Sequence, residues 1–286
     1  MVAPLRRVIV KRPEEAFRNA GAIRKESAPL GYTRPPDLDR AIAGHREFVA
    51  LLAAAGADIL YLPEDDRTGL DSIYTHDPVL VTEAGAIIFQ MGKPERRGEG
   101  PAFEDALRRW DVPILGRIDG DATAEAGDMV WLDRRTLLVG HSFRTNAAGI
   151  DRLSALVRPL GVAVIPVQLP YWRGPREVLH LMSFVSLLDD DLAIVNRPLM
   201  PVSLFQLLQE RGIELIDVPE QEFESLGCNL LAVSQRKIVM VRGNTLTRQR
   251  AEAAGCSVSE FDGTEICLPG AGGPTCLTRP LLRETI

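Results

Sequence analysis

DPVLVTEAGAIIFQ, at residues 77–90, is the stretch from which we predict the fold of this chain. It has two runs rich in Val, Ile and Leu on either side of a polar turn, which is the composition of a β-hairpin. Three further segments share this design: DMVWLDRRTLLVG at 128–140, HLMSFVSLLDDDLAIV at 180–195 and NLLAVSQRKIVMV at 229–241. Their runs are apolar on both faces, so we expect helices to cover these strands.

Each of these segments begins with a polar residue, and the polar residues recur at a nearly even interval. Asp77, Asp128, His180 and Asn229 are followed by Cys276, which lies in the glycine-rich segment GAGGPTCLTRP, at intervals of 51, 52, 49 and 47 residues. A period of about 50 residues is typical of an internally repeated architecture. Repeats arranged around an axis would bring two acids, an imidazole, an amide and a thiol to one centre. That set suits a cysteine-nucleophile enzyme that acts on a cation.

Helical periodicity fills the gaps between the hairpins. The expected helices cover residues 37–56, 101–110, 146–160, 202–212 and 244–254, with Asp37 and Asn146 at the start of two of them. A first strand is expected in MVAPLRRVIVKRPEE at the N-terminus. The repeating unit is therefore hairpin, helix, strand, present about five times in a single α/β domain over residues 1–286. The alternative is an ordinary α+β domain whose hairpins happen to be evenly spaced.

The composition narrows the class of function. The chain has 286 residues and a formal net charge of −6, which argues against nucleic acid and suits a small cationic ligand. No window of 18 apolar residues is free of charges, so we expect no membrane span. The four cysteines form no Cys-x-x-Cys pair and no zinc spacing with the four histidines. We therefore expect a cytoplasmic enzyme with free thiols and no metal ion.

Two segments stand outside the repeat. Residues 12–36 show no clear periodicity, which predicts a long loop, either a lid over a site or a plain surface excursion. In the second, glycines and prolines surround Cys276 in GAGGPTCLTRP. Glycine lets the backbone approach a ligand closely, so this turn is the better candidate for chemistry.

Cys276 and His180 are the candidates for nucleophile and general acid/base. A cysteine reacts as the thiolate and needs a polar niche, which the glycine-rich turn can provide. A histidine at the start of an apolar strand can protonate a leaving amine and then activate water. The alternatives are an inert cysteine and a core histidine. The other three cysteines lie in or beside apolar runs, where a buried, unreactive thiol is the ordinary interpretation.

Three acids and two arginines complete the candidate set. Asp77 lies in IYTHDP, and Glu125 and Asp128 lie in EAGDMVW. Carboxylates accept paired N–H bonds from a planar guanidinium, so two of them could hold one from both sides. Arg97 and Arg144 follow the first and second hairpins, and either could hold a substrate carboxylate. Exposed surface charges are the alternative for all five.

These motifs, in this order, resemble the guanidino-modifying enzymes of the pentein superfamily. The resemblance rests on IYTHDP, EAGDMVW, VGHSFRTNAAG, HLMSF and GAGGPTCLTRPL and covers about residues 6–283. The superfamily includes dimethylarginine dimethylaminohydrolases, arginine deiminases and amidinotransferases. It implies a five-bladed α/β propeller of ββαβ units with pseudo-fivefold symmetry, which agrees with the repeat.

The resemblance also implies roles for individual residues. Cys276 resembles the nucleophile, His180 the general acid/base, and Asp77 and Glu125 the acids that bind the guanidinium. Arg144 resembles the arginine that grips the substrate carboxylate, and Arg97 the second such arginine, with Arg96 as the alternative. Asp71 and Tyr74 match pocket-lining positions of the dimethylarginine enzymes, whereas Asp128 is expected to be a structural acid.

The chemistry implied by the resemblance is hydrolysis of an N-methylated arginine to citrulline through a thiouronium intermediate, without a metal or cofactor. Arginine deiminases carry an acid where this chain has Met182, which favours the dimethylarginine enzymes. Those enzymes carry an acid where this chain has His76, which bears on tolerance for N-methyl groups. Another guanidino hydrolase, an amidinotransferase and a non-catalytic pentein stay as alternatives, and a homodimer stays open.

Overall fold

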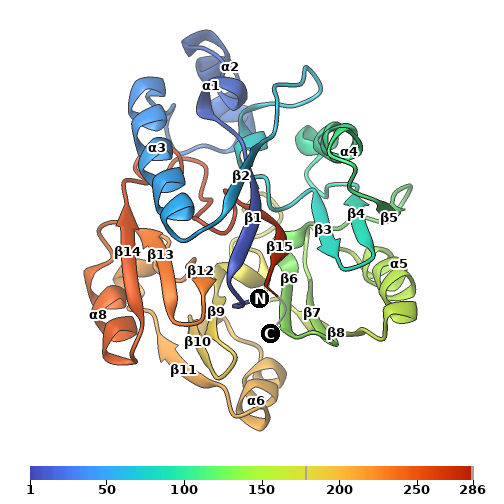
Figure 1. Cartoon of the computed structure of the whole chain (residues 1–286), viewed down its shortest axis with the longest axis vertical. Coiled ribbons are helices and arrows are strands. Elements are labelled where there is room, and N and C mark those ends of the chain that lie inside the picture. The colour runs from blue at the N-terminus through green and yellow to red at the C-terminus, as the bar shows by residue number, and fades with distance from the viewer. Residues whose placement is uncertain (178, 285–286) are drawn as a thin grey trace.

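The computed structural model describes residues 1–177 and 179–284 and contains five three-stranded sheets arranged around a ring (Figure 1). The first sheet joins β15 (Arg279–Arg283), β1 (Leu5–Val10) and β2 (Asp58–Tyr61), and so unites the two ends of the chain. Each of the other four sheets consists of three strands that follow one another in the sequence. The second sheet contains β3 (Val79–Thr82), β4 (Gly85–Phe89) and β5 (Ile114–Ile118), and the third contains β6 (Met129–Asp133), β7 (Thr136–His141) and β8 (Ala163–Gln168). The fourth contains β9 (Val185–Asp189), β10 (Leu192–Val195) and β11 (Glu214–Asp217), and the fifth contains β12 (Leu231–Ser234), β13 (Lys237–Val241) and β14 (Ser257–Phe261).

Every sheet is built in the same way. Its middle strand pairs antiparallel with one neighbour and parallel with the other. A parallel pair needs a long crossover, and one helix on the outside of the ring supplies it in each unit (Figure 1). These helices are α3 (Leu38–Ala54), α4 (Glu99–Arg109), α5 (Ala147–Val157), α6 (Val202–Glu210) and α8 (Thr245–Ala253). The predicted hairpins, the first strand, the five helices and the repeat are confirmed.

Burial explains why the hairpin segments lack polar alternation. Every residue of the middle strands β4 and β10 is buried, because a helix covers one face and the ring interior the other. The third strands, such as β5, lie at the outer edge and are half-buried. Apolar clusters fill the space between strands and helices, with Phe89, Phe103 and Phe184 among the largest fully buried side chains.

The structure corrects the prediction of a long loop at residues 12–36. This segment contains α1 (Pro13–Ala16) and α2 (Ala20–Leu30). The Asn19 side chain caps α2 by accepting the N–H groups of Gly21 and Ala22, and Gly31 ends it in the left-handed conformation. Only Ile23 and Ser27 of α2 are buried, so this helix has no apolar stripe for a periodicity search to detect.

Short elements complete the described chain. They are α7 (Glu220–Phe223) and the 3-10 helices η1 (Leu70–Ile73), η2 (Pro94–Arg96), η3 (Ala126–Asp128), η4 (Arg158–Leu160), η5 (Leu181–Ser183) and η6 (Arg197–Leu199). Among the described residues, no helix combines the length and apolar character that a membrane span needs.

Asn146 caps helix α5 and also binds the loop before the second hairpin, so its replacement tests how much these contacts stabilise the fold. Its side-chain oxygen accepts the N–H groups of Gly149 at the start of α5 and of Thr123, and its amide donates to the Asp121 carbonyl. We expect Asn146→Ala to lower the free energy of unfolding by about 1–2 kcal/mol, because a helix cap and a loop contact are lost together. Denaturant unfolding measures this. Asn146→Asp keeps the acceptor oxygen and should lose less; equal stability of the alanine variant and the wild type would contradict the assignment.

Candidate active site

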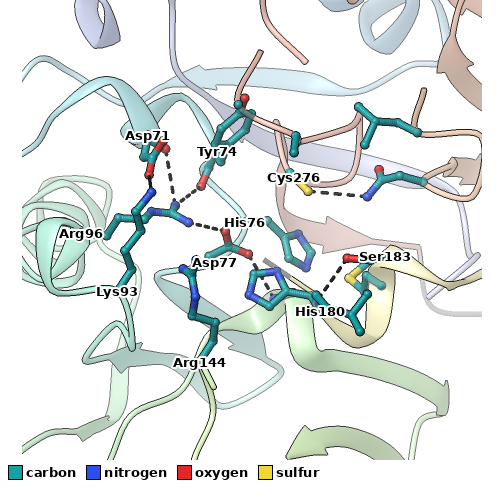
Figure 2. A pocket seen from close by; sticks show the side chains of 18 of the residues that line it. Asp71, Tyr74, His76, Asp77, Lys93, Arg96, Arg144, His180, Ser183 and Cys276 are labelled. Atoms are coloured by element: carbon teal, nitrogen blue, oxygen red, sulfur yellow. Dashed lines mark hydrogen bonds and ion pairs between the residues drawn. The ribbon is translucent and has the colours of Figure 1, made fainter. Parts of the chain in front are cut away.

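A cavity of about 110 Å³ lies where the polar residues of the repeat converge (Figure 2). Of the predicted site residues, those lining the cavity are Asp71, Tyr74, Asp77, Arg144, His180 and Cys276. The other described side chains on its wall include His76, Lys93, Arg96, Trp172, Met182, Phe223 and Asn229. The wall thus combines charged and apolar side chains.

The repeat explains this convergence. Asp77 follows η1, Glu125 precedes η3, and His180 precedes η5, in each case just before the first strand of a hairpin. Asn229 precedes β12 and Cys276 precedes β15 in the same way. The interval of about 50 residues therefore places one polar side chain from each unit at the same end of its sheet.

Glu125 and His180 form the buried centre of the site. The His180 Nε2 donates to the Glu125 Oε2 over 2.8 Å, and Glu125 has no exposed surface. Glu125 also accepts the Lys93 backbone N–H at 3.1 Å and lies 3.4 Å from the Arg144 Nη1. Burial raises the pKa of Glu125, but Arg144 and then His180 lower it by more, so the pKa lies below its usual range. Burial likewise lowers the pKa of His180, but the surrounding carboxylates, Asp128 first, raise it above 6.5.

Gly127 fixes the other side of the imidazole. A Cβ at this position would lie 2.3 Å from the His180 Nδ1 and 2.9 Å from the Asp77 Oδ1, so only glycine lets the ring approach the backbone of η3. Asp77, Glu125 and His180 each place one side-chain atom within 4.8 Å of the other two. An imidazole and two carboxylates therefore meet at one point, where Asp77 and His180 line the cavity and Glu125 lies buried behind them.

Asp77 is held by both a backbone donor and a cation. Its Oδ1 accepts the Gly127 N–H at 3.2 Å, and its Oδ2 accepts the Arg96 Nη1 at 2.7 Å. Burial raises the pKa of Asp77, but Arg96 and His180 lower it by more, so Asp77 is ionised at neutral pH. Each carboxylate oxygen retains a further acceptor position for a ligand.

The structure corrects the choice between the two neighbouring arginines. Arg97 is exposed and is not among the residues that line the cavity, whereas Arg96 is buried there. The Arg96 guanidinium also pairs with both oxygens of Glu99, at 2.9 and 2.8 Å. The sequence preference for Arg97 is therefore not supported, and Arg96 is committed to carboxylates of the protein.

The Cys276 thiol lies on the wall across from the arginines (Figure 2). The Asn229 amide donates to its Sγ over 3.6 Å, while the Asn229 carbonyl oxygen accepts the N–H and hydroxyl of Thr275. Burial and the Asp77 carboxylate raise the pKa of Cys276 to about 11, so the thiol is protonated at rest. A cation bound beside Asp77 would lower that pKa.

His76 occupies the place of the acid in the dimethylarginine enzymes that the sequence resembles. Its backbone N–H donates to the Cys276 carbonyl at 3.1 Å, and its Nδ1 lies 2.9 Å from the Thr278 carbonyl. A carbonyl only accepts, so Nδ1 carries the proton and Nε2 is an acceptor. Burial and then Arg279 lower the pKa of His76 to about 3, so this position is neutral.

Asp128 has the even spacing of the other site residues but a different position. Its Oδ1 accepts the Leu181 N–H at 3.1 Å and its Oδ2 accepts the Ser142 hydroxyl at 2.6 Å. Burial raises the pKa of Asp128 to about 6. It joins η3 to the start of η5, and so positions His180 from behind the cavity wall.

Among the cavity side chains to which the sequence analysis gave no role are Asn229 and Lys93. Asn229 is one of the polar residues that recur at an interval of about 50 residues, so its position in the sequence indicated a place in the site, but no role was assigned to it. Lys93 carried no signal, since it follows the first hairpin in an ordinary polar turn. Its Nζ donates to the Asp71 Oδ2 and to the Leu30 carbonyl, each over 2.6 Å.

Comparisons with known proteins show which family this chain resembles. The family model of N,N dimethylarginine dimethylhydrolase, eukaryotic, matches residues 24–283. The N(G),N(G)-dimethylarginine dimethylaminohydrolase of Pseudomonas aeruginosa is 30% identical over 243 residues, which are 85% of this chain and 89% of the relative. An arginine deiminase of Listeria welshimeri is 26% identical over 255 residues, 74% of this chain and 62% of the relative. A solved structure of the Pseudomonas aeruginosa enzyme, a mutant complexed with citrulline, superimposes with a TM-score of 0.78 and 26% identity, covering 96% of this chain and 98% of that one.

The ring of five ββαβ units and its central polar cavity define a pentein-fold enzyme. The chain belongs to the N,N dimethylarginine dimethylhydrolase family. Together these findings make it a hydrolase of C–N bonds other than peptide bonds.

The Glu125–His180 pair predicts a pH-dependent stability. Because folding raises the pKa of His180 above 6.5, the stabilisation is complete below about pH 6.5 and is lost as pH rises through the folded-state pKa. Glu125, with its lowered pKa, stays ionised throughout that window. We expect the stability difference between wild type and His180→Gln to be larger at pH 6 than at pH 9, by about 1.4 kcal/mol for each unit of the shift.

Denaturant unfolding at both pH values measures this difference. His141→Gln is the matched control, because the His141 ring contacts the Gln168 side chain instead of a carboxylate. A His180→Gln difference that is the same at pH 6 and pH 9 would show that the ion pair does not form.

Proposed function

We propose that this protein hydrolyses N-methylated arginine to citrulline and a methylamine through a covalent intermediate on Cys276. The observation that carries the proposal is the placement of the ionised Asp77 carboxylate, the His180 imidazole and the Cys276 thiol on the wall of one cavity, with the buried, ionised Glu125 carboxylate bonded to His180. A guanidinium is a planar cation with paired N–H donors, and this set of acceptors suits it. The catalytic unit is the whole ring, residues 1–286.

Binding comes first. The guanidinium donates to Asp77 and Glu125, which keep it charged and fix its plane. Charge on the guanidinium makes its central carbon electrophilic and, beside Cys276, stabilises the thiolate. The thiol, with a resting pKa of about 11, is thus activated by the substrate that it attacks.

The first half-reaction forms a C–S bond. The Cys276 thiol loses its proton to solvent as the guanidinium binds. The thiolate then adds to the guanidinium carbon, and the tetrahedral adduct collapses with loss of the methylated nitrogen. His180 gives the departing amine a proton. The product of this step is an S-alkylthiouronium on Cys276 and free dimethylamine or methylamine.

The second half-reaction breaks the C–S bond. His180, now neutral, removes a proton from water, whose oxygen adds to the thiouronium carbon. Collapse of this adduct releases the ureido product and regenerates the Cys276 sulfur. Neither half-reaction calls for a metal or an organic cofactor.

Two observations bear on the choice between this proposal and hydrolysis of unmethylated arginine, one for each. The arginine deiminase relative is an observation in favour of hydrolysis of unmethylated arginine. Met182, however, offers no carboxylate where the sequence resemblance expects one in deiminases, and its buried side chain forms part of the apolar wall. An amidinotransferase would differ in using an amine in place of water.

The test is turnover of asymmetric dimethylarginine, monomethylarginine, arginine and agmatine, scored for ureido product and released amine. We expect citrulline and dimethylamine from the first compound, and loss of turnover by at least a factor of about 1,000 in Cys276→Ser, because a hydroxyl is a far weaker nucleophile. Cys256→Ser is the matched control, since that cysteine lies outside the cavity lining. Turnover that survives in Cys276→Ser, or no ureido product from any of the four compounds, would refute the proposal.

A further inference from the structure

Lys93 is a cation inside the cavity that the proposed reaction does not use. Figure 2 shows its side chain running along the cavity wall to Asp71. Its Nζ donates to the Asp71 Oδ2 and to the Leu30 carbonyl at the end of α2, each over 2.6 Å. The Lys93 side chain is 16% exposed and that of Asp71 is 7% exposed, so the pair is largely shielded from water.

This contact changes what Asp71 can bind. A buried carboxylate in a guanidino-substrate cavity is a natural partner for the α-ammonium of an amino acid substrate. Here the carboxylate is already neutralised by the ammonium of Lys93. An incoming α-ammonium would have to displace Lys93 or lie beside a like charge in a medium of low dielectric constant, and both are unfavourable.

Lys93 also provides a donor for an anion. An ammonium has three N–H donors, and the contacts with the Leu30 carbonyl and the Asp71 carboxylate use two of them. The Lys93 backbone lies beside Arg144, since a Cβ on the preceding Gly92 would come within 2.6 Å of the Arg144 Cα. Both residues also contact Glu125.

Arg96, which also lines the cavity, is not available to bind a substrate carboxylate. Arg96 donates to Glu99, to Asp77 and to the Tyr74 carbonyl, and its side chain is 4% exposed. Arg144 is different, because its contacts with Glu125 are long, at 3.4 Å. Among the cavity residues that the structure describes, the cationic donors open to a substrate carboxylate are therefore those of Lys93 and Arg144.

We propose that Lys93 is a specificity-determining residue: it cancels the α-ammonium site at Asp71 and, with Arg144, binds the substrate carboxylate. The cavity then accepts ω-guanidino acids that lack an α-amino group at least as well as the corresponding amino acids. This inference rests on the proposed function, because it names which guanidino compounds fit the same site.

The experiment compares Nω-methylarginine with its des-amino counterpart, 5-(N′-methylguanidino)pentanoate, at one pH and ionic strength. For the wild type we expect kcat/KM of the guanidino acid to equal or exceed that of the amino acid. Lys93→Met, which keeps the length of the side chain and removes its charge, frees Asp71 and should shift the ratio at least tenfold towards the amino acid. Lys25→Met, at an exposed position of α2, is the matched control and should leave the ratio unchanged.

The opposite pattern would overturn the inference: a wild type that prefers the amino acid more than tenfold, with a ratio that Lys93→Met leaves unchanged. Failure of the proposed function is distinguishable, because it would abolish turnover of both compounds. In that case calorimetric binding of the same two compounds to Cys276→Ser decides the question. Tighter binding of the guanidino acid supports the role of Lys93, and tighter binding of the amino acid refutes it.

Discussion

The fully buried Glu125 carboxylate is the constraint on which the rest of the site depends. A charge without solvent must be paired, and removal of one partner from such a pair costs about 3–5 kcal/mol. Glu125 obtains its partners from three parts of the chain: His180 just before η5, Arg144 just after β7, and the Lys93 backbone after β4. The contacts that hold the catalytic groups therefore also tie adjacent units of the ring together.

The other buried acids around the cavity are paired with cations in the same way. Arg96 joins Asp77 to Glu99, and Lys93 joins Asp71 to the end of α2, so most of the acids around the cavity have a defined cationic partner. Burial still has visible effects, since it raises the pKa of Glu99 to about 7 although Arg96 pairs with it. A ligand cation that enters this network competes with existing pairs. Which ligands bind then depends on which of the existing ion pairs are weak enough to be displaced. The long contact between Arg144 and Glu125 is one of these weak pairs.

Much of this could be predicted from the sequence because the repeat is a matter of spacing. Hairpins with evenly spaced polar residues at their starts predict units around an axis, and the convergence of Asp77, His180 and Cys276 follows. The choice between Arg96 and Arg97 could not be made, because neighbours in a 3-10 helix point about 120° apart and spacing does not say which one faces inward. Lys93 was missed for a related reason: its importance comes from Leu30 and Asp71, which lie far from it in the sequence. Helix α2 was missed because it has no apolar stripe.

The central claim is that Asp77 and Glu125 hold a guanidinium against Cys276. A crystal structure of Cys276→Ser with bound Nω-methylarginine tests it most directly. We expect the guanidinium nitrogens to lie within hydrogen-bond distance of both carboxylates, with the central carbon facing the side chain at position 276. A guanidinium bound elsewhere in the cavity, with the Arg96–Asp77 and His180–Glu125 contacts undisturbed and no contact to either acid, would contradict it.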